Sequence, residues 1–246
     1  MQDVKVSRLN LLLFFLGLTF FIVNGSVLSQ TLPLPQTLTP LTSPQGSRLL
    51  RESKAQEDFI PLSSQFVTQE NQAFCGVASA VMVLNALGVP APVATEWKRN
   101  YFTQDNLFNA QTDAVISRQQ IEHQGLTLAQ LAAILESYPV KAKVHYGADL
   151  SLDQFRSMVS QNLKQSGNFV VVNYSRRAIG QEGGGHISPL AAYNAEKDQF
   201  LILDVSRYKY PSVWVKTKEL WEAIKTIDPV SQKTRGVIFI SPLTTR

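Results

Sequence analysis

The chain has 246 residues, 44% of them hydrophobic, which is enough to bury one substantial core but short for two. Lys and Arg number 23 against 19 Asp and Glu, giving a net charge of +4, yet the positive residues are scattered and form no run that would follow a phosphate backbone. One folded domain is therefore expected, and the charge pattern argues against nucleic acid as a partner.

The amino terminus has the layout of a secretory signal. Lys5 and Arg8 precede an apolar segment at 11–23, and small residues follow as far as Ser29. The apolar segment is shorter than the roughly 20 residues that usually span a bilayer. We predict a signal peptide over 1–29, cleavage after Ser29, and a periplasmic protein with no membrane attachment after processing; an uncleaved segment would instead anchor the chain to the membrane.

The next segment, from Gln30 to Gln45, reads QTLPLPQTLTPLTSPQ and shows no helical or strand periodicity. Such a composition is typical of an extended linker. We therefore assign 30–52 to a linker and 53–246 to the folded domain.

Helices are predicted mainly in the first half of that domain. An apolar face beginning at Cys75 and a stop at Gly88 place Cys75 at a helix amino terminus. Capping boxes open two further helices, at Thr127 to Gln130 and at Ser151 to Gln154. A fourth helix is expected from Thr217 to Ile227.

Strands follow mainly in the second half, as short segments rich in β-branched and aromatic residues. The predicted strands are Val140 to Tyr146, Phe169 to Tyr174, Ile187 to Tyr193, Phe200 to Val205 and Val237 to Ser241. Because parallel units would alternate strands with helices, this segregation predicts an α+β domain with an antiparallel sheet.

Two of the predicted strands form a hairpin that bears on chemistry. A turn over 194–198 would place Tyr193 opposite Gln199, so that paired residue numbers sum to 392. His186 and Asp204 then become diagonal neighbours on one face, about 7–8 Å apart. A register shifted by one residue would separate them.

The same residues supply what a nucleophilic thiol requires. Cys75 would gain thiolate character from the helix amino terminus, with His186 as the base and Asp204 orienting the imidazole. The side chain of Gln69, six residues earlier, would join the backbone N–H of Cys75 in an oxyanion hole. Each residue also has an ordinary alternative, since a lone Cys is often only a small buried residue.

Three segments, FVTQENQAFCGVASAVMVLNAL (66–87), NYSRRAIGQEGGGHISPLAAY (173–193) and LILDVSRYKYPSVW (201–214), strongly resemble phytochelatin synthases, especially the short cyanobacterial forms. The resemblance implies a papain-like cysteine protease fold. It also implies cleavage of the Cys–Gly bond of glutathione, with the γ-glutamylcysteinyl group carried on Cys75 as a thioester and passed to water or to a second glutathione. In that family the residues matching Cys75, His186 and Asp204 form the triad, and Gln69 lines the oxyanion hole.

The resemblance further implies a site for the two carboxylates of glutathione. Arg235, in the TRG motif, is expected near the γ-glutamyl group, and Arg176 is a second candidate because Arg binds carboxylates through two nitrogens. Exposed Arg side chains at strand ends are the alternative. Asn173, Gly185 and Tyr208 complete the expected substrate-binding residues.

No resident cofactor or metal is expected, because one Cys and three His cannot build a thiolate cage. Cadmium or zinc would enter as a thiolate of the substrate, and the lack of the cysteine-rich extension of the plant enzymes puts activation by metal in doubt. Glutathione and its S-conjugates are the expected partners, and a homodimer is left open. The alternative functions are a papain-like peptidase acting on leader peptides and a non-enzymatic thiol or metal carrier.

Overall fold

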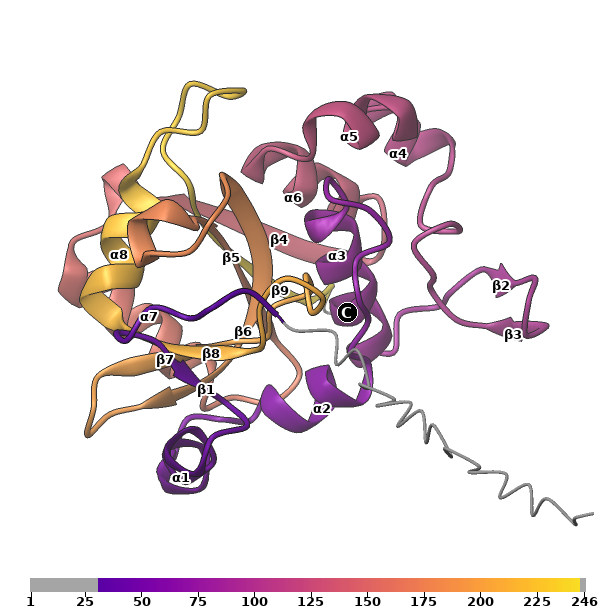
Figure 1. Ribbon diagram of the computed structural model, residues 1–246. Coiled ribbons are helices and arrows are strands. Elements are labelled where there is room, and N and C mark those ends of the chain that lie inside the picture. Colours follow the sequence, from indigo (N-terminus) through magenta and orange to yellow (C-terminus); the bar gives the residue numbers. More distant parts are fainter. Residues whose placement is uncertain (1–30, 244–246) are drawn as a thin grey trace, which may run out of the picture. The chain divides into compact units, whose positions relative to one another are not determined.

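The computed structural model describes residues 31–243, so the predicted signal peptide lies outside the described residues. Seven antiparallel strands form one sheet in the order β1-β8-β7-β6-β5-β9-β4 (Figure 1). The strands are β1 (Thr39–Pro40), β4 (Val140–Tyr146), β5 (Phe169–Ser175), β6 (Gly185–Asn194), β7 (Gln199–Ile202), β8 (Val213–Lys216) and β9 (Gly236–Pro242). The predicted α+β class with an antiparallel sheet is confirmed.

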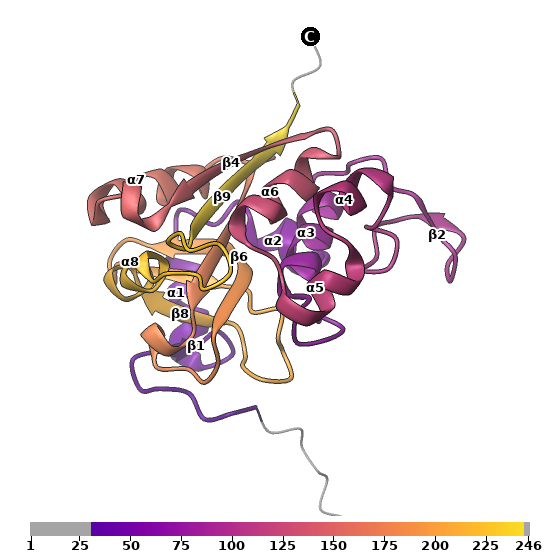
Figure 2. The same cartoon turned by 90° about the horizontal axis from the view of Figure 1, so that it is seen from above.

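Helices cover both faces of this sheet, as Figures 1 and 2 show. One face carries α2 (Phe59–Ser64), α3 (Cys75–Ala86), α4 (Ala110–Val115), α5 (Arg118–Gln124) and α6 (Leu128–Glu136), and the other carries α7 (Leu152–Asn162) and α8 (Thr217–Lys225). Alternate residues of β5 divide between the two cores, with Val171 on the α3 side and Val170 and Val172 on the α8 side. Covered faces explain why these strands are continuously apolar.

Helix α3 is the central helix of the hydrophobic core on the sheet face that carries α2 to α6, and every residue from 75 to 84 is buried. It begins at Cys75 and is followed by Gly88, whose φ of 66° fits the predicted glycine stop. The capping boxes predicted at Thr127 and Ser151 are both present, at the starts of α6 and α7. The helix expected to begin at Thr217 is α8. These local predictions therefore place the elements that carry the site.

The prediction of an extended linker over 30–52 is wrong for the part that the structure describes. Strand β1 pairs with β8, and helix α1 (Pro44–Glu52) follows, with Ser43 capping its amino terminus and Pro44 at its first position. The backbone carbonyl of Gly46 accepts a 3.0 Å hydrogen bond from the buried indole of Trp214. Proline and threonine content suggested a linker, but Ser followed by Pro is also a helix start.

The predicted hairpin register is also wrong next to the turn. Asn194 pairs with Gln199 and Tyr193 with Phe200, one residue away from the expected pairing. A bulge between Leu190 and Ala192 then corrects the offset, so that Leu190 pairs with Ile202 as predicted. The diagonal neighbourhood of His186 and Asp204 therefore survives, although the argument from turn length did not include the bulge.

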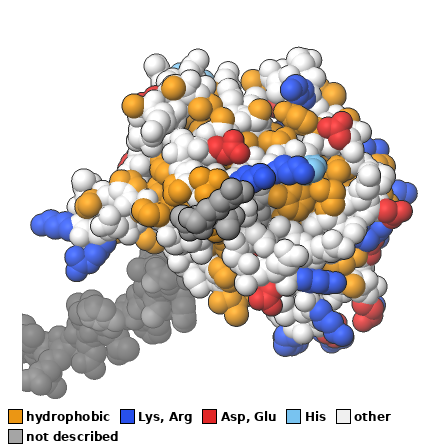
Figure 3. All heavy atoms as spheres, turned by 180° about the vertical axis from the view of Figure 1, so that it is seen from behind, with side chains coloured by type: hydrophobic (Ala, Val, Ile, Leu, Met, Phe, Trp, Pro, Cys, Tyr) orange, Lys and Arg blue, Asp and Glu red, His pale blue; other side chains and the backbone are white. Residues whose placement is uncertain are grey.

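Among the described residues on the face seen in Figure 3, Lys and Arg side chains are dispersed among acidic and uncharged ones. Within residues 31–243, no helix combines the length and the apolar character needed to cross a membrane. The apolar segment at 11–23 lies outside that range. A small separate hairpin of β2 (Val93–Ala94) and β3 (Arg99–Asn100) completes the fold.

Candidate active site

Cys75 is the first residue of α3 and lines a cavity, although only 8% of its surface is exposed. The backbone N–H groups of the first helical turn have no partners within the helix, and their partial positive charge favours a thiolate at this position. The Ser79 hydroxyl donates to the Cys75 carbonyl at 2.8 Å and lies 3.3 Å from the Ile187 carbonyl. These contacts hold the helix start against β6.

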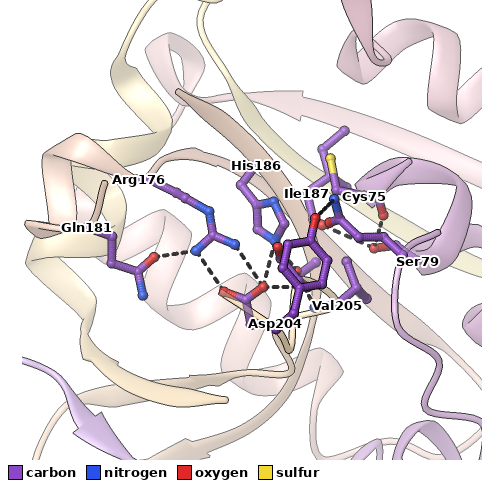
Figure 4. A network of polar contacts seen from close by, with 12 residues as sticks. Cys75, Ser79, Arg176, Gln181, His186, Ile187, Asp204 and Val205 are labelled. Atoms are coloured by element: carbon purple, nitrogen blue, oxygen red, sulfur yellow. Dashed lines mark hydrogen bonds and ion pairs between the residues drawn. The ribbon is translucent and has the colours of Figure 1, made fainter. Parts of the chain in front are cut away.

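His186 stands next to Cys75 on β6 and is joined to Asp204. Its Nε2 lies 2.8 Å from Oδ1 of Asp204 and 3.0 Å from the Ser188 hydroxyl. Because Nε2 is engaged in this way, Nδ1 is the nitrogen left to face the thiol. Figure 4 shows the imidazole between Asp204 and Cys75. The structure thus brings together the three residues that the sequence proposed as nucleophile, base and orienting acid.

Asp204 follows β7 and is fully buried. Arg176 binds its carboxylate through two nitrogens, at 2.8 Å from Nη1 to Oδ2 and 2.9 Å from Nη2 to Oδ1. The backbone N–H of Ser206 donates a further bond of 2.9 Å to Oδ1. A buried carboxylate is costly unless paired, and here both oxygens have partners.

The three titratable groups shift in the directions that nucleophilic catalysis needs. Burial raises the pKa of the Cys75 thiol, but the hydrogen bond and charge of His186, the backbone of Ile187 and the charge of Arg176 together lower it below its usual value. Burial lowers the pKa of His186, but the charge of Asp204 raises it above its usual value. Burial opposes the ionised form of Asp204, yet His186 and Arg176 hold its pKa well below the usual range. The geometry therefore favours a thiolate beside an imidazolium.

Gln69 is buried beside the site, but its amide group is already engaged. Nε2 donates to the carbonyl of Asn71 at 2.7 Å and to the hydroxyl of Tyr208 at 3.2 Å. To bind an oxyanion, Gln69 would have to exchange the longer contact for substrate, and Tyr208, which is 45% exposed, is free enough to move. Its role in an oxyanion hole stays a prediction.

A cavity of about 690 Å³ extends from Cys75 and His186 towards Arg235. Nη1 of Arg235 donates to Oδ1 of Asn173 at 3.0 Å, and its Nε donates to the Thr226 hydroxyl at 3.2 Å. Gly185 forms the wall behind the guanidinium, since a Cβ there would lie 2.3 Å from Nη1. The structure therefore gathers Arg235, Asn173 and Gly185 into one cavity with the thiol, as expected.

A second cavity, of about 270 Å³, adjoins the first and shares Gln72, Gly185 and His186 with its lining. It is lined by Gln69, Gly185 and His186 together with Tyr208 and Lys209. Arg176 also borders this cavity, but its guanidinium is bonded to Asp204 and Gln181. Space for a second molecule thus exists beside the first cavity.

Sequence reasoning missed two residues of the site. Asp228 lines the first cavity with Arg235 and is held by the Val230 N–H and the Ser231 hydroxyl. Ser188 contacts the imidazole and also accepts a bond from the Val205 N–H. Asp228 stands in a polar loop before Pro229, with no local signal of a role. The expected pairing, in which residue numbers sum to 392, places Ser188 opposite Asp204, which was the available signal.

Within residues 31–243, no three His, Cys, Asp or Glu side chains lie close enough together to hold a metal ion. The entry of cadmium or zinc as a substrate thiolate stays a prediction.

A buried thiol paired with imidazole and carboxylate at a helix amino terminus, open to a cavity, is the arrangement of cysteine-dependent acyl-transfer and hydrolytic enzymes.

Comparison with known proteins agrees with this class. The family model for phytochelatin synthase matches residues 29–237, and the chain belongs to that family. It is similar to glutathione gamma-glutamylcysteinyltransferase 1 of Lotus japonicus, with 35% identity over 85% of this chain and 41% of that protein. Glutathione gamma-glutamylcysteinyltransferase of Schizosaccharomyces pombe is 31% identical over 80% of this chain and 46% of its own length. The chain thus spans less than half the length of these curated relatives.

Proposed function

We propose that the chain is a γ-glutamylcysteinyl acyltransferase that cleaves the Cys–Gly bond of glutathione and passes the acyl group to water or to a second glutathione. The observation that carries this proposal is the cavity that joins the Cys75 thiol to a buried pair of opposite charges, Arg235 and Asp228. The names of the similar proteins, glutathione gamma-glutamylcysteinyltransferases, support the same substrate.

The γ-glutamyl end of glutathione carries an α-amino group and an α-carboxylate. Arg235 suits the carboxylate through a charge-assisted hydrogen bond, and Asp228 suits the ammonium group. Both residues are buried, so water screens their charges little. A cavity of this size accommodates a small peptide. Recognition of the γ-glutamyl end would leave the Cys–Gly carbonyl beside the thiol.

In the first step the Cys75 thiolate attacks that carbonyl carbon, and the peptide C–N bond breaks. The imidazolium of His186 gives its Nδ1 proton to the departing glycine nitrogen, leaving a thioester and neutral imidazole. In the second step His186 accepts a proton from water or from the amine of a second glutathione, whose nitrogen or oxygen forms the new bond as the C–S bond breaks. The thiolate and imidazolium are then restored.

The ratio of transfer to hydrolysis depends on how well an acceptor is held. The second cavity adjoins His186 and contains Lys209, a cation suited to an acceptor carboxylate. Holding the acceptor amine in this cavity raises its effective concentration, so that it can compete with water for the thioester. This cavity is the place proposed for the acceptor glutathione.

The function is tested by incubating the folded protein with glutathione and measuring free glycine. Wild type should release glycine and gain, on rapid acid quench, the mass of a γ-glutamylcysteinyl group on Cys75. Cys75→Ser should lose both signals and the labelling by iodoacetamide. The isomer with an ordinary α-linked glutamate is the matched substrate control, and equal turnover of both would contradict recognition by Arg235 and Asp228.

The antiparallel sheet with a helical layer bearing the nucleophile is consistent with the proposed papain-like fold. A leader peptidase, the second candidate, would cleave long peptides in preference to glutathione and would not need the Arg235 and Asp228 pair. Export to the periplasm, and metal thiolates or S-conjugates as substrates, are proposed on the sequence alone.

A further inference from the structure

Arg176 was expected to bind a substrate carboxylate, but its guanidinium contacts other side chains of the protein instead. The residue is buried, and its donors go to Asp204 at 2.8 and 2.9 Å and to Gln181. The ring of Tyr210 covers the guanidinium, with its centroid 5.2 Å from Cζ. Figure 4 shows Gln181, Arg176, Asp204 and His186 joined in series. These contacts occupy the guanidinium inside the protein.

We propose that Arg176 is a positioning residue, which holds the Asp204 carboxylate in place and, through it, sets the pH window in which Cys75 is reactive. The proposal rests on the proposed function of Cys75, His186 and Asp204 as a catalytic unit. Two parallel bonds fix the plane of a carboxylate in a way that one bond does not. Oδ1 of Asp204 is thereby kept 2.8 Å from Nε2 of His186.

The charge of Arg176 acts as well as its geometry. The guanidinium offsets part of the Asp204 charge, so it lowers the pKa of His186, and its field also lowers the pKa of Cys75. Without it both values rise. Thiolate and imidazolium coexist between these two values, so the whole window of reactivity moves to higher pH.

Several other titratable or charged groups also face the site. They are Tyr174 on β5, whose ring lies edge-on to His186, Lys209 and Tyr210 from the loop after β7, Asp228 and Arg235 before β9, and Glu122 and His123 of α5. Because these groups remain in the variant, a shift of the alkylation profile to higher pH reports the loss of the Arg176 charge.

The test measures the rate of Cys75 alkylation by iodoacetamide against pH, which requires no glutathione and so stays informative if the proposed substrate is wrong. The alkylation rate rises with pH as the Cys75 thiolate forms, and Arg176→Gln should move this rise to higher pH by about one unit. Arg176→Lys keeps the positive charge but loses the two parallel hydrogen bonds to Asp204. Its alkylation profile should therefore stay near that of wild type, while kcat for glycine release falls about tenfold. Arg177→Gln is the matched control, because Arg177 is exposed in the same turn, and its profile should coincide with wild type.

An unshifted profile for Arg176→Gln, with only a higher KM for glutathione, would overturn the proposal and make Arg176 a substrate-binding residue. If Arg176→Gln does not fold, Arg176→Lys decides the question. A lower kcat at unchanged KM supports a positioning role, and a higher KM at unchanged kcat refutes it.

Discussion

Gly185→Ala tests the proposed binding role of Arg235 without touching the thiol. Gly185 lies in β6 with an ordinary backbone, so alanine brings no conformational strain. Its Cβ would stand 2.3 Å from Nη1 of Arg235 and 2.8 Å from Cζ, whereas ordinary contact begins at 3.4 Å. The guanidinium must therefore move by about 1 Å, away from its 3.0 Å bond to Asn173. A misplacement of that size in a positioning group can lower catalysis by about 100-fold.

Hydrogen bonds to a charged group contribute about 1.5–3 kcal/mol, which corresponds to a loss of about 10- to 100-fold in kcat/KM for glutathione. The assay is glycine release at rising glutathione, with iodoacetamide labelling as the measure of an intact thiol. Gly184→Ala is the matched control, because no atom in the described part of the chain lies within 4 Å of its added Cβ. If Gly185→Ala retained wild-type kcat/KM with labelling intact, Arg235 would not act as proposed, whereas parallel loss of labelling and turnover would indicate a disturbed fold.

Three further predictions follow from the same structure. His186→Ala should abolish glycine release almost as fully as loss of the thiol, whereas Asp204→Asn should lower kcat severely but measurably; a wild-type rate for Asp204→Asn would make the carboxylate purely structural. Arg235→Lys should lower kcat/KM for glutathione with labelling of Cys75 intact, and equal loss of labelling would indicate a disturbed fold. Burial, with the nearby charge of Glu57, raises the pKa of Asp58 to about 8, and neither of its carboxylate oxygens has a hydrogen-bond partner within residues 31–243. The wild-type folded state therefore loses stability as the pH rises from about 4 to 8. In urea unfolding, the free energy of unfolding of Asp58→Asn should increase relative to wild type by about 1.4 kcal/mol per pH unit in that range. A difference that does not change with pH would contradict the burial of an ionisable carboxyl.

Much of the scaffold was predictable because its signals are local. A capping side chain accepts a hydrogen bond from a backbone N–H only three residues away, so Thr127 and Ser151 indicate where their helices begin whatever the rest of the fold. The same holds for Cys75 at a helix start with Gly88 beyond its end. Strands β4, β5, β6 and β9 were placed to within two residues at each end by their apolar β-branched content. The sequence alone therefore determined the class of fold and the position of the thiol.

Long-range contacts decided the rest. The bulge near Ala191 depends on how β6 fits both β5 and β7, and turn length does not encode it. Arg176 is directed to Asp204 because a buried carboxylate requires a partner, and only the folded chain shows which cation can reach it. Asp228 enters the cavity because the loop before β9 bends back on itself through its own side-chain bonds. Local hydrogen bonds and side-chain patterns thus made the helices and strands predictable from the sequence. The pairing of buried charges was not predictable, because it depends on distant segments that meet only in the tertiary structure.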